Sequence, residues 1–264
     1  FFDSKIDLEK TGLSPGLSGK RVIVQGLGNV GYHAALFLSK EDGAKITHVL
    51  ERGGAIINEQ GIDIQRLRDH IIQNGSIKGY PGFSDKGPEL MEADADILIP
   101  AAMELVITEE NAARIKAPLI IEAANGPISS NADKILNKNS KIIIPDLYAN
   151  AGGVTVSYFE WIKNLSRIRF GRLQRRAQEN QLSSLISGIE SMTKEKFSDE
   201  FKKEIVKGDS ELDLVRSGLE DTMRTTYDVI SARWNSDKNI PDLRTAAMMV
   251  SISRVASTYS TLGL

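Results

Sequence analysis

The stretch that decides the fold of this chain is Arg21-Val22-Ile23-Val24-Gln25-Gly26-Leu27-Gly28-Asn29-Val30-Gly31. It opens with a β-branched run bounded by glycine, which predicts a short strand over 21–25. Residues 29–40 carry apolar side chains at helical spacing, and residues 45–50 are apolar again. A strand, a helix and a second strand in this order predict a βαβ unit with parallel strands.

The glycines of this stretch have the spacing G-x-G-x-x-G where the predicted strand leads into the predicted helix. Gly26 is expected to allow a tight turn, Gly28 to let the backbone approach a pyrophosphate, and Gly31 to let helix and strand pack closely. Asn29 and Val30 open the helix, whose N-terminal N–H groups and dipole favour an anion. These residues predict a dinucleotide-binding turn, although glycines also serve plain strand-to-helix turns.

An acidic residue follows the predicted second strand, as such a site requires. Glu51 stands twenty residues after Gly31, and its carboxylate is expected to accept hydrogen bonds from the adenosine ribose of NAD. Arg52 leaves a second interpretation open, because its guanidinium could pair with the 2′-phosphate of NADP or could be a solvated loop residue. The sequence therefore predicts NAD as the cofactor, with NADP possible.

Further short apolar runs suit strands that are buried on both faces of a parallel sheet. The runs lie at 96–99, 119–121 and 141–144, and helix-like stretches lie at 109–115 and 131–136. We expect residues 12–150 to form a doubly wound (Rossmann-type) parallel sheet of the α/β class, entered by a breaker-rich linker at 12–20.

The strand pattern stops after Ala149, and helical periodicity replaces it. Helices are predicted at 154–165, 182–201, 212–234 and 242–259. The polar segment from Ser166 to Asp213 is typical of an excursion from a compact body. The expected organisation is a dinucleotide-binding domain over 1–165, an insertion over 166–213, and C-terminal helices over 214–264 that pack back on the domain.

The composition favours small-molecule partners. Of 264 residues, 41% are hydrophobic and 26% are charged, as in ordinary globular chains. A formal net charge of -2 provides no general attraction to nucleic acid or to an anionic membrane. The absence of cysteine excludes thiolate metal sites and cysteine nucleophiles. No metal site is predicted, and no apolar run reaches the roughly 18 residues of a membrane helix.

Three longer strings resemble the second domain of glutamate dehydrogenases, which belong with the leucine, phenylalanine and valine dehydrogenases. They are Ile99-Pro100-Ala101-Ala102, Glu122-Ala123-Ala124-Asn125-Gly126-Pro127 and Pro145-Asp146-Leu147-Tyr148-Ala149-Asn150-Ala151-Gly152-Gly153-Val154-Thr155-Val156-Ser157-Tyr158-Phe159-Glu160-Trp161. The resemblance extends from Gly16 to Asp242-Leu243-Arg244-Thr245-Ala246-Ala247. It implies oxidative deamination of L-glutamate to 2-oxoglutarate and ammonia, with hydride transfer to NAD(P), by a homo-oligomer (a hexamer) of the cytoplasm or the mitochondrial matrix.

The resemblance also implies roles for single residues. Ala101, Ala102 and Asn125 would line the nicotinamide-ribose end of the cleft, and Asn150 would hydrogen-bond the carboxamide. Each lies just past a predicted strand, at the edge where open α/β sheets bind ligands, although an Asn there can also stabilise a turn.

Val154 and Ser157 lie one helical turn apart, and the resemblance places this pair against the substrate side chain. The hydroxyl of Ser157 suits the distal carboxylate of glutamate. A helix N-cap is the alternative role for this serine.

The catalytic lysine of the family stands in a G-G-x-K-G-G segment of an N-terminal domain. The only double glycines here are Gly53-Gly54 and Gly152-Gly153, and neither is followed by a suitable lysine. We therefore assign no catalytic residue within the chain and expect it to be inactive alone. The missing initiator Met favours a portion of a complete glutamate dehydrogenase. The alternatives are a noncatalytic nucleotide-binding regulatory subunit and a dehydrogenase for a branched or aromatic amino acid.

The excursion is entered by Ile168-Arg169-Phe170-Gly171-Arg172-Leu173 and resembles a short form of the antenna of animal-type glutamate dehydrogenases. Leu36 and Thr225 stand where basic ligands for nucleotide effectors would be expected, which argues against regulation by GTP or ADP.

Overall fold

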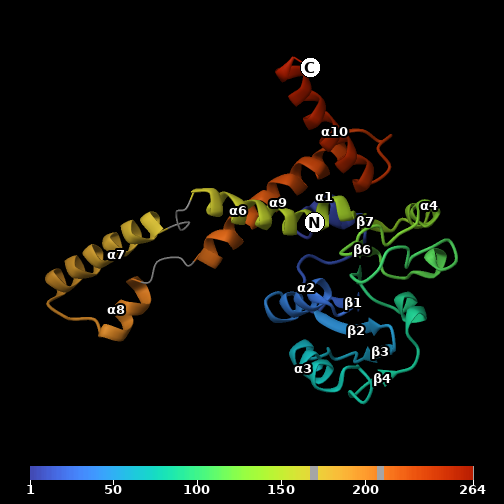
Figure 1. Cartoon of the computed structure of the whole chain (residues 1–264), viewed down its shortest axis with the longest axis horizontal. Coiled ribbons are helices and arrows are strands. Elements are labelled where there is room, and N and C mark those ends of the chain that lie inside the picture. The colour runs from blue at the N-terminus through green and yellow to red at the C-terminus, as the bar shows by residue number, and fades with distance from the viewer. Residues whose placement is uncertain (167–171, 207–210, 264) are drawn as a thin grey trace. The chain divides into compact units, whose positions relative to one another are not determined.

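A computed structural model describes residues 1–166, 172–206 and 211–263, which Figure 1 traces from end to end. The chain divides into two compact units. The first comprises residues 1–151 and 227–264, and the second comprises residues 152–226. The domain boundaries expected at 165 and 213 lie inside the second unit, and they stay predictions.

Within the described residues, the first unit is built on a seven-stranded sheet with the order β4-β3-β2-β1-β5-β6-β7. The strands are β1 (Arg21–Gln25), β2 (Lys45–Glu51), β3 (Gly54–Ile57), β4 (Phe83–Ser84), β5 (Ile97–Pro100), β6 (Leu119–Ile121) and β7 (Ile142–Ile144). The five strands from β2 to β7 across the sheet are parallel. The chain passes from β1 outward to β2 and later returns to β5 on the other side of β1. This reversal confirms the predicted doubly wound sheet.

Two antiparallel strands, β3 and β4, extend the sheet beyond β2 and were not predicted. Gly54 begins β3 with a φ of +136°, and a Cβ there would lie 2.3 Å from the carbonyl oxygen of Ser84. Gly54, which the sequence pattern did not place in a strand, therefore allows β3 and β4 to approach closely. Strand β4 has two residues, too few to show any periodicity.

The helices of the first unit cover both faces of the sheet. They are α1 (Lys5–Glu9), α2 (Asn29–Lys40), α3 (Ile64–Asn74), α4 (Ser130–Lys138), α5 (Asp146–Ala149), the part of α9 (Glu211–Ser236) from Tyr227 onward and α10 (Leu243–Leu262), with the 3₁₀ turns η1 (Pro88–Glu92) and η2 (Ala112–Arg114). The predicted helices at 29–40 and 131–136 are confirmed, whereas α3 was not predicted. The core explains the apolar runs, because Val22 and Val24 belong to one buried cluster and Ile23 to the other.

The helix-like stretch at 109–115 forms only the short turn η2, which corrects the expectation. The side chain of Asn111 accepts a hydrogen bond from Thr108 N at 2.9 Å and donates one to Val106 O at 2.9 Å. Such side-chain bonds to nearby backbone compete with helix formation.

The second unit is helical. It contains most of α6 (Ala151–Ser166), α7 (Arg172–Thr193), α8 (Asp199–Val206) and the first part of α9 (Glu211–Ser236). The single helix predicted at 182–201 is wrong, because the chain turns between α7 and α8. Lys194 has a φ of +60°, and Phe197 N donates to the Glu190 carboxylate at 2.8 Å. Residues 168–171 of the entry segment expected at 168–173 lie outside the described residues.

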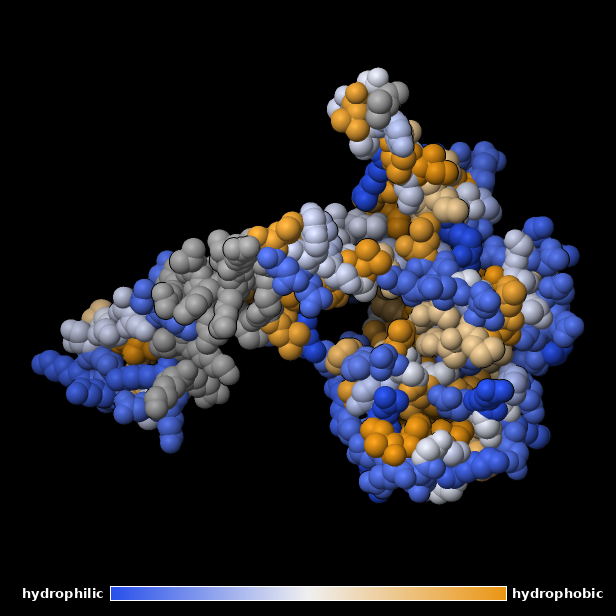
Figure 2. Space-filling view, viewed as in Figure 1, coloured by the Kyte–Doolittle hydropathy of each residue, from blue (hydrophilic) through white to orange (hydrophobic). Residues whose placement is uncertain are grey.

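Helix α10 packs its beginning into the core of the first unit through Leu243, Ala246 and Ala247. Large apolar side chains are exposed along the rest of the helix, and Figure 2 shows them at the top of the view. They are Met248, Ile252, Val255, Tyr259 and Leu262. No helix in the described part of the chain is both long and apolar enough to cross a membrane.

Candidate dinucleotide-binding site

The site residues predicted in the first unit follow five parallel strands. Because the carboxyl ends of parallel strands meet at one edge, the sheet brings them to the same edge. They are Gly26 to Gly31 after β1, Glu51 and Arg52 at the end of β2, Ala101 and Ala102 after β5, Asn125 after β6, and Asn150 after β7. The strand order reverses between β1 and β5, and open α/β sheets bind ligands at such a switch point.

The three glycines of the turn have different environments. Gly26 has a φ of +90°, and a Cβ there would lie 2.5 Å from the Cβ of Ala102. A Cβ at Gly31 would lie 1.9 Å from the carbonyl oxygen of Gly26. At Gly28, which begins α2 as its N-cap, a Cβ would meet nothing within 4 Å. The first and third glycines are thus required by packing, whereas the second borders open space that a pyrophosphate could occupy.

The Glu51 carboxylate reaches the glycine turn. Its Oε1 accepts a hydrogen bond from Leu27 N at 2.5 Å, and Gly26 N donates to Leu50 O at 2.7 Å. The half-buried Glu51 is therefore held beside the turn, whereas its neighbour Arg52 is exposed.

A cation that was not predicted from the sequence lies at the glycine turn. Arg68 on α3 donates from Nη1 to Leu27 O at 3.0 Å, and its guanidinium lies 5.3 Å from the centre of the Tyr32 ring. Because α3 was not predicted, no sequence signal related Arg68 to the glycine turn. The Leu27 backbone thus contacts the acidic side chain of Glu51 through its N–H and the basic side chain of Arg68 through its C=O.

The segment that follows β5 is hydrogen-bonded to the last residue of β1, next to the glycine turn. Ala101 N donates to Gln25 O at 2.8 Å, and Ala102 N donates to the Gln25 side-chain oxygen at 3.3 Å. Gln25, the last residue of β1, therefore fixes the chain that follows β5.

The two predicted asparagines contact each other. Asn150 Nδ2 donates to Asn125 Oδ1 at 2.8 Å, although the residues are 25 positions apart. Asn125 is exposed and Asn150 is half-buried. Their amides lie just past the carboxyl ends of β6 and β7, and this pairing requires the two strands to be neighbours.

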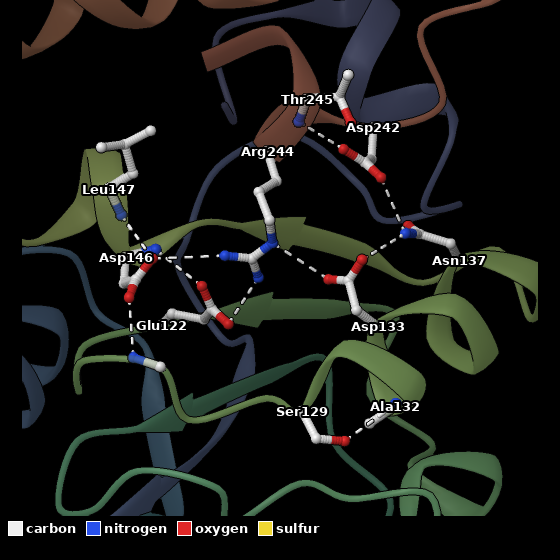
Figure 3. Close-up of polar contacts among 11 residues, drawn as sticks. Glu122, Ser129, Ala132, Asp133, Asn137, Asp146, Leu147, Asp242, Arg244 and Thr245 are labelled. Atoms are coloured by element: carbon white, nitrogen blue, oxygen red, sulfur yellow. Dashed lines mark hydrogen bonds and ion pairs between the residues drawn. The ribbon is translucent and has the colours of Figure 1, made fainter. Parts of the chain in front are cut away.

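An ion cluster around the fully buried Glu122 supports the loops that carry these asparagines (Figure 3). Arg244 at the beginning of α10 points its guanidinium at the carboxylates of Glu122, Asp133 and Asp146. The distances are 2.8 Å from Nη2 to Glu122, 3.3 Å from Nε to Asp133, and 3.4 Å from Nη1 to Asp146. Asp242 caps α10 by accepting from Thr245 N at 2.7 Å.

Burial changes the proton affinity of two members of this cluster. Glu122 is 0% exposed, and burial raises its pKa although the Arg244 guanidinium opposes the shift. Burial likewise raises the pKa of Asp133, again against Arg244. Desolvation disfavours an ionised carboxylate, whereas the Arg244 guanidinium favours the charged form of both acids.

Val154 and Ser157 lie on α6, in the second unit. Helix α6 begins at Ala151, so Ser157 is not its N-cap, and that alternative is wrong. The Ser157 hydroxyl donates to Gly153 O at 3.0 Å within its own helix, and Val154 is 73% exposed.

The chain is similar to known proteins over most of its length. The profile of the Glutamate/Leucine/Phenylalanine/Valine dehydrogenase family matches residues 7–212. A probable glutamate dehydrogenase of Sinorhizobium fredii is 46% identical over 251 residues, which are 92% of this chain and 57% of that protein. The mitochondrial glutamate dehydrogenase of Dictyostelium discoideum is 44% identical over 258 residues, which are 97% of this chain and 51% of that protein. The chain spans about half the length of these relatives.

A solved structure has the same fold. The hetero-hexameric glutamate dehydrogenase of Thermus thermophilus, in a leucine-bound form, matches with a TM-score of 0.73 and 23% identity. The match covers 98% of this chain and 51% of that one. The fold, the residue strings and the extent of the sequence match lead to one conclusion: the chain belongs to the Glutamate/Leucine/Phenylalanine/Valine dehydrogenase family.

Proposed function

We propose that this chain is the cofactor-binding part of a glutamate dehydrogenase and that it holds NAD(P) along the carboxyl edge of its sheet. One observation carries the proposal: two sets of groups suited to opposite ends of a dinucleotide lie at this edge. The glycine turn with the Glu51 carboxylate suits the adenosine and pyrophosphate end. The Asn125–Asn150 pair suits the nicotinamide end.

Each residue has a distinct role in this proposal. The open space at Gly28 and the free N–H groups of Asn29, Val30 and Gly31 at the beginning of α2 receive the pyrophosphate. Ala101 and Ala102 line the nicotinamide-ribose end together with Asn125. Asn150 donates to the nicotinamide carboxamide.

The choice between NAD and NADP depends on the charges beside the Leu27 peptide. The Glu51 carboxylate accepts from the ribose hydroxyls of NAD and repels a 2′-phosphate at short range. Arg52 and Arg68 partly offset that repulsion, but Arg68 already donates to Leu27 O. We therefore infer that NAD is the preferred cofactor and that NADP is accepted more weakly.

The proposed reaction is the oxidative deamination of L-glutamate. When bound, NAD(P) would supply the hydride acceptor for the α-carbon of the amino acid, and hydrolysis of the resulting imine would release 2-oxoglutarate and ammonia. In this chain, Val154 and Ser157 contact the substrate side chain, with the Ser157 hydroxyl donating to the distal carboxylate. The acid-base groups belong to a part of the enzyme that contains the glycine-flanked lysine, which this sequence lacks.

The assembled enzyme is proposed to be a homo-oligomer, a hexamer by analogy with the hexameric relative from Thermus thermophilus. Its compartment is proposed to be the cytoplasm or the mitochondrial matrix, and one relative is named as mitochondrial.

Calorimetric titration of the 264-residue chain with NAD tests the binding site. Gly28→Val should abolish binding, because the new side chain fills the space proposed for the pyrophosphate while meeting no protein atom. Gly188→Val is the matched control, since a Cβ there also meets nothing within 4 Å. Unchanged binding by the Gly28 variant, or no binding by the unaltered chain, would remove the turn from the site.

A further inference from the structure

We propose that Arg244 is a positioning residue for the nicotinamide half of the cofactor, because its guanidinium fixes the two loops that carry Asn125 and Asn150. The inference rests on the proposed function and goes beyond it. Arg244 is distant in sequence from both loops, being 122 residues from its partner Glu122. Arg244 is not one of the residues expected to touch the cofactor.

The geometry of the guanidinium is the first step. Its three nitrogens face three different carboxylates, which come from the end of β6 (Glu122), from α4 (Asp133) and from the beginning of α5 (Asp146). The fork shape of arginine allows one side chain to serve three elements at once, and an ammonium group has no equivalent geometry. Arg244 thereby connects α10 to three separate segments.

Two of these carboxylates, Glu122 and Asp146, also hold the loop after β6 by hydrogen bonds to its backbone and to the beginning of α5. Glu122 Oε2 accepts from Asp146 N at 2.8 Å, so the end of β6 is tied to the beginning of α5. Asp146 Oδ2 accepts from Gly126 N at 2.8 Å. Gly126 follows Asn125 directly and has a φ of +54°, so this hydrogen bond holds the turn that presents the Asn125 amide.

The same constraint reaches Asn150 through α5. Asn150 N donates to Asp146 O at 2.9 Å, and the Asn150 amide then donates to Asn125 Oδ1 at 2.8 Å. Glu122, Asp146, Gly126, Asn125 and Asn150 thus form one continuous hydrogen-bonded path. Arg244 contacts the path at its two carboxylates.

Charge explains why the path depends on Arg244. Two carboxylates, Glu122 and Asp146, lie close enough for one to accept from the backbone N–H of the other residue. Glu122 is fully buried, and only 29% of the Arg244 side chain is exposed. Without the guanidinium, like charges would face each other at low dielectric, and the beginning of α5 would move away from β6.

The test compares two ligands on the full 264-residue chain, NADH and ADP-ribose. ADP-ribose contains the adenosine, pyrophosphate and second ribose of NADH but lacks nicotinamide. Arg244→Lys should weaken NADH binding about three- to tenfold, as expected for the loss of one well-placed hydrogen bond. ADP-ribose binding should change less than NADH binding, because ADP-ribose shares only the Asn125 ribose contact, lacks the carboxamide proposed for Asn150, and keeps its contacts with the unaltered glycine turn and Glu51.

Matched variants separate positioning from folding. Arg114→Lys alters another arginine that donates twice to one carboxylate, Glu92, at 2.7 Å, and should affect neither ligand. Glu122→Gln keeps an acceptor for Asp146 N but removes one of the two facing charges, so in the Arg244→Lys background it should restore part of the NADH binding. In an Asn150→Ala background, Arg244→Lys should add no further loss, because the position it controls no longer carries the amide.

Each outcome decides between hypotheses. If the unaltered chain binds neither ligand, the proposed function fails. If it binds NADH no more tightly than ADP-ribose, or if Arg244→Lys leaves NADH binding unchanged or weakens both ligands equally, Arg244 has no positioning role and the inference is overturned. Selective loss for NADH that disappears in the Asn150→Ala background supports the positioning role.

Discussion

At Gly26, Gly28 and Gly31 the lack of a side chain has different physical consequences. Gly26 adopts a φ of +90°, which residues with a side chain rarely tolerate. Gly31 lets the first turn of α2 lie against the Gly26 carbonyl. Gly28 has neither constraint, because its φ is -69° and a Cβ would meet no atom. A glycine that the fold does not need is the one most directly explained by a ligand.

The charges beside this turn lead to a prediction for cofactor choice. Glu51→Ser should shift preference towards NADP, because the substitution removes a negative charge near the proposed 2′-phosphate position and leaves Arg52 and Arg68 in place. The shift should be about tenfold in the ratio of the NAD and NADP dissociation constants, equivalent to about 1.4 kcal/mol. Calorimetric titration with both cofactors measures it.

Glu59→Ser is the control for this prediction, since Glu59 is an exposed acid in the turn that follows β3. It should leave the preference unchanged. An unaltered ratio in the Glu51 variant would mean that its carboxylate serves only Leu27 N.

At the scale of single helices, α6 contains the proposed substrate contacts. Ser157→Val in the complete dehydrogenase should lower kcat/KM for glutamate about ten- to a hundredfold, because a hydrogen bond to a charged group is worth roughly 1.5 to 3 kcal/mol. Activity on an apolar substrate such as norleucine should be spared or raised, since no unpaired hydroxyl faces the alkyl chain. Steady-state kinetics with both substrates measure the difference.

The Ser157 hydroxyl donates to Gly153 O in the chain without substrate, so it exchanges this bond for the substrate carboxylate. Ser157→Ala separates the two roles, because it removes the hydroxyl without adding bulk. Equal losses for glutamate and norleucine in both variants would show that the serine acts only within its own helix.

Another pair of helices, α1 and α9, is joined by a buried carboxylate. Asp7 accepts hydrogen bonds from Tyr227 at 2.8 Å, from Ser231 at 2.5 Å and from Asn235 at 2.9 Å. Burial opposes the ionisation of Asp7, but these donors outweigh it and hold its pKa below the ordinary value. The folded state therefore binds the Asp7 proton less tightly than the unfolded state.

This difference predicts a pH dependence. The stabilisation by Asp7 is present above the unfolded pKa of about 3.9 and is lost as the pH falls through the lower folded pKa. Asp7→Asn should reduce the free energy of unfolding by about 1 to 3 kcal/mol at pH 7, and the difference from the unaltered chain should shrink below pH 4. Urea unfolding at both pH values measures it.

Glu9→Gln provides the comparison, because Glu9 is an exposed acid on the same helix. It should leave the stability and its pH dependence unchanged. A constant difference between Asp7→Asn and the unaltered chain from pH 7 to pH 3 would contradict the role of the ionised carboxylate.

At the scale of the whole molecule, cofactor binding and turnover should be separable. The 264-residue chain should bind NADH but show no glutamate oxidation, because the sequence lacks the glycine-flanked lysine of the family. The loss of general acid-base catalysis alone is worth about 10²- to 10⁴-fold. Absorbance of NADH during incubation with glutamate and NAD measures turnover. Sustained glutamate oxidation by the purified chain would place the catalytic groups within it.

Much of the cofactor edge could be predicted because the information is local. The apolar run at 21–25, the glycines after it and the periodicity of 29–40 each depend on neighbouring residues, and they predicted β1, the turn and α2 with the observed bounds. The helix predicted at 109–115 is wrong because the local pattern there was ambiguous. The Asn111 side chain hydrogen-bonds to nearby backbone groups, and only a short 3₁₀ turn forms.

The amino-acid sequence by itself determined the doubly wound sheet, the family, and which residues follow the strand ends. Only the tertiary structure decided which side chains meet. Arg68 reaches the glycine turn from a helix 41 positions away, and Arg244 meets Glu122 across 122 positions. Both pairings depend on the order of strands in the sheet and on the packing of α3 and α10. The physical reason is that local sequence patterns specify elements through nearest neighbours, whereas ion pairs and amide contacts form only after distant elements have packed.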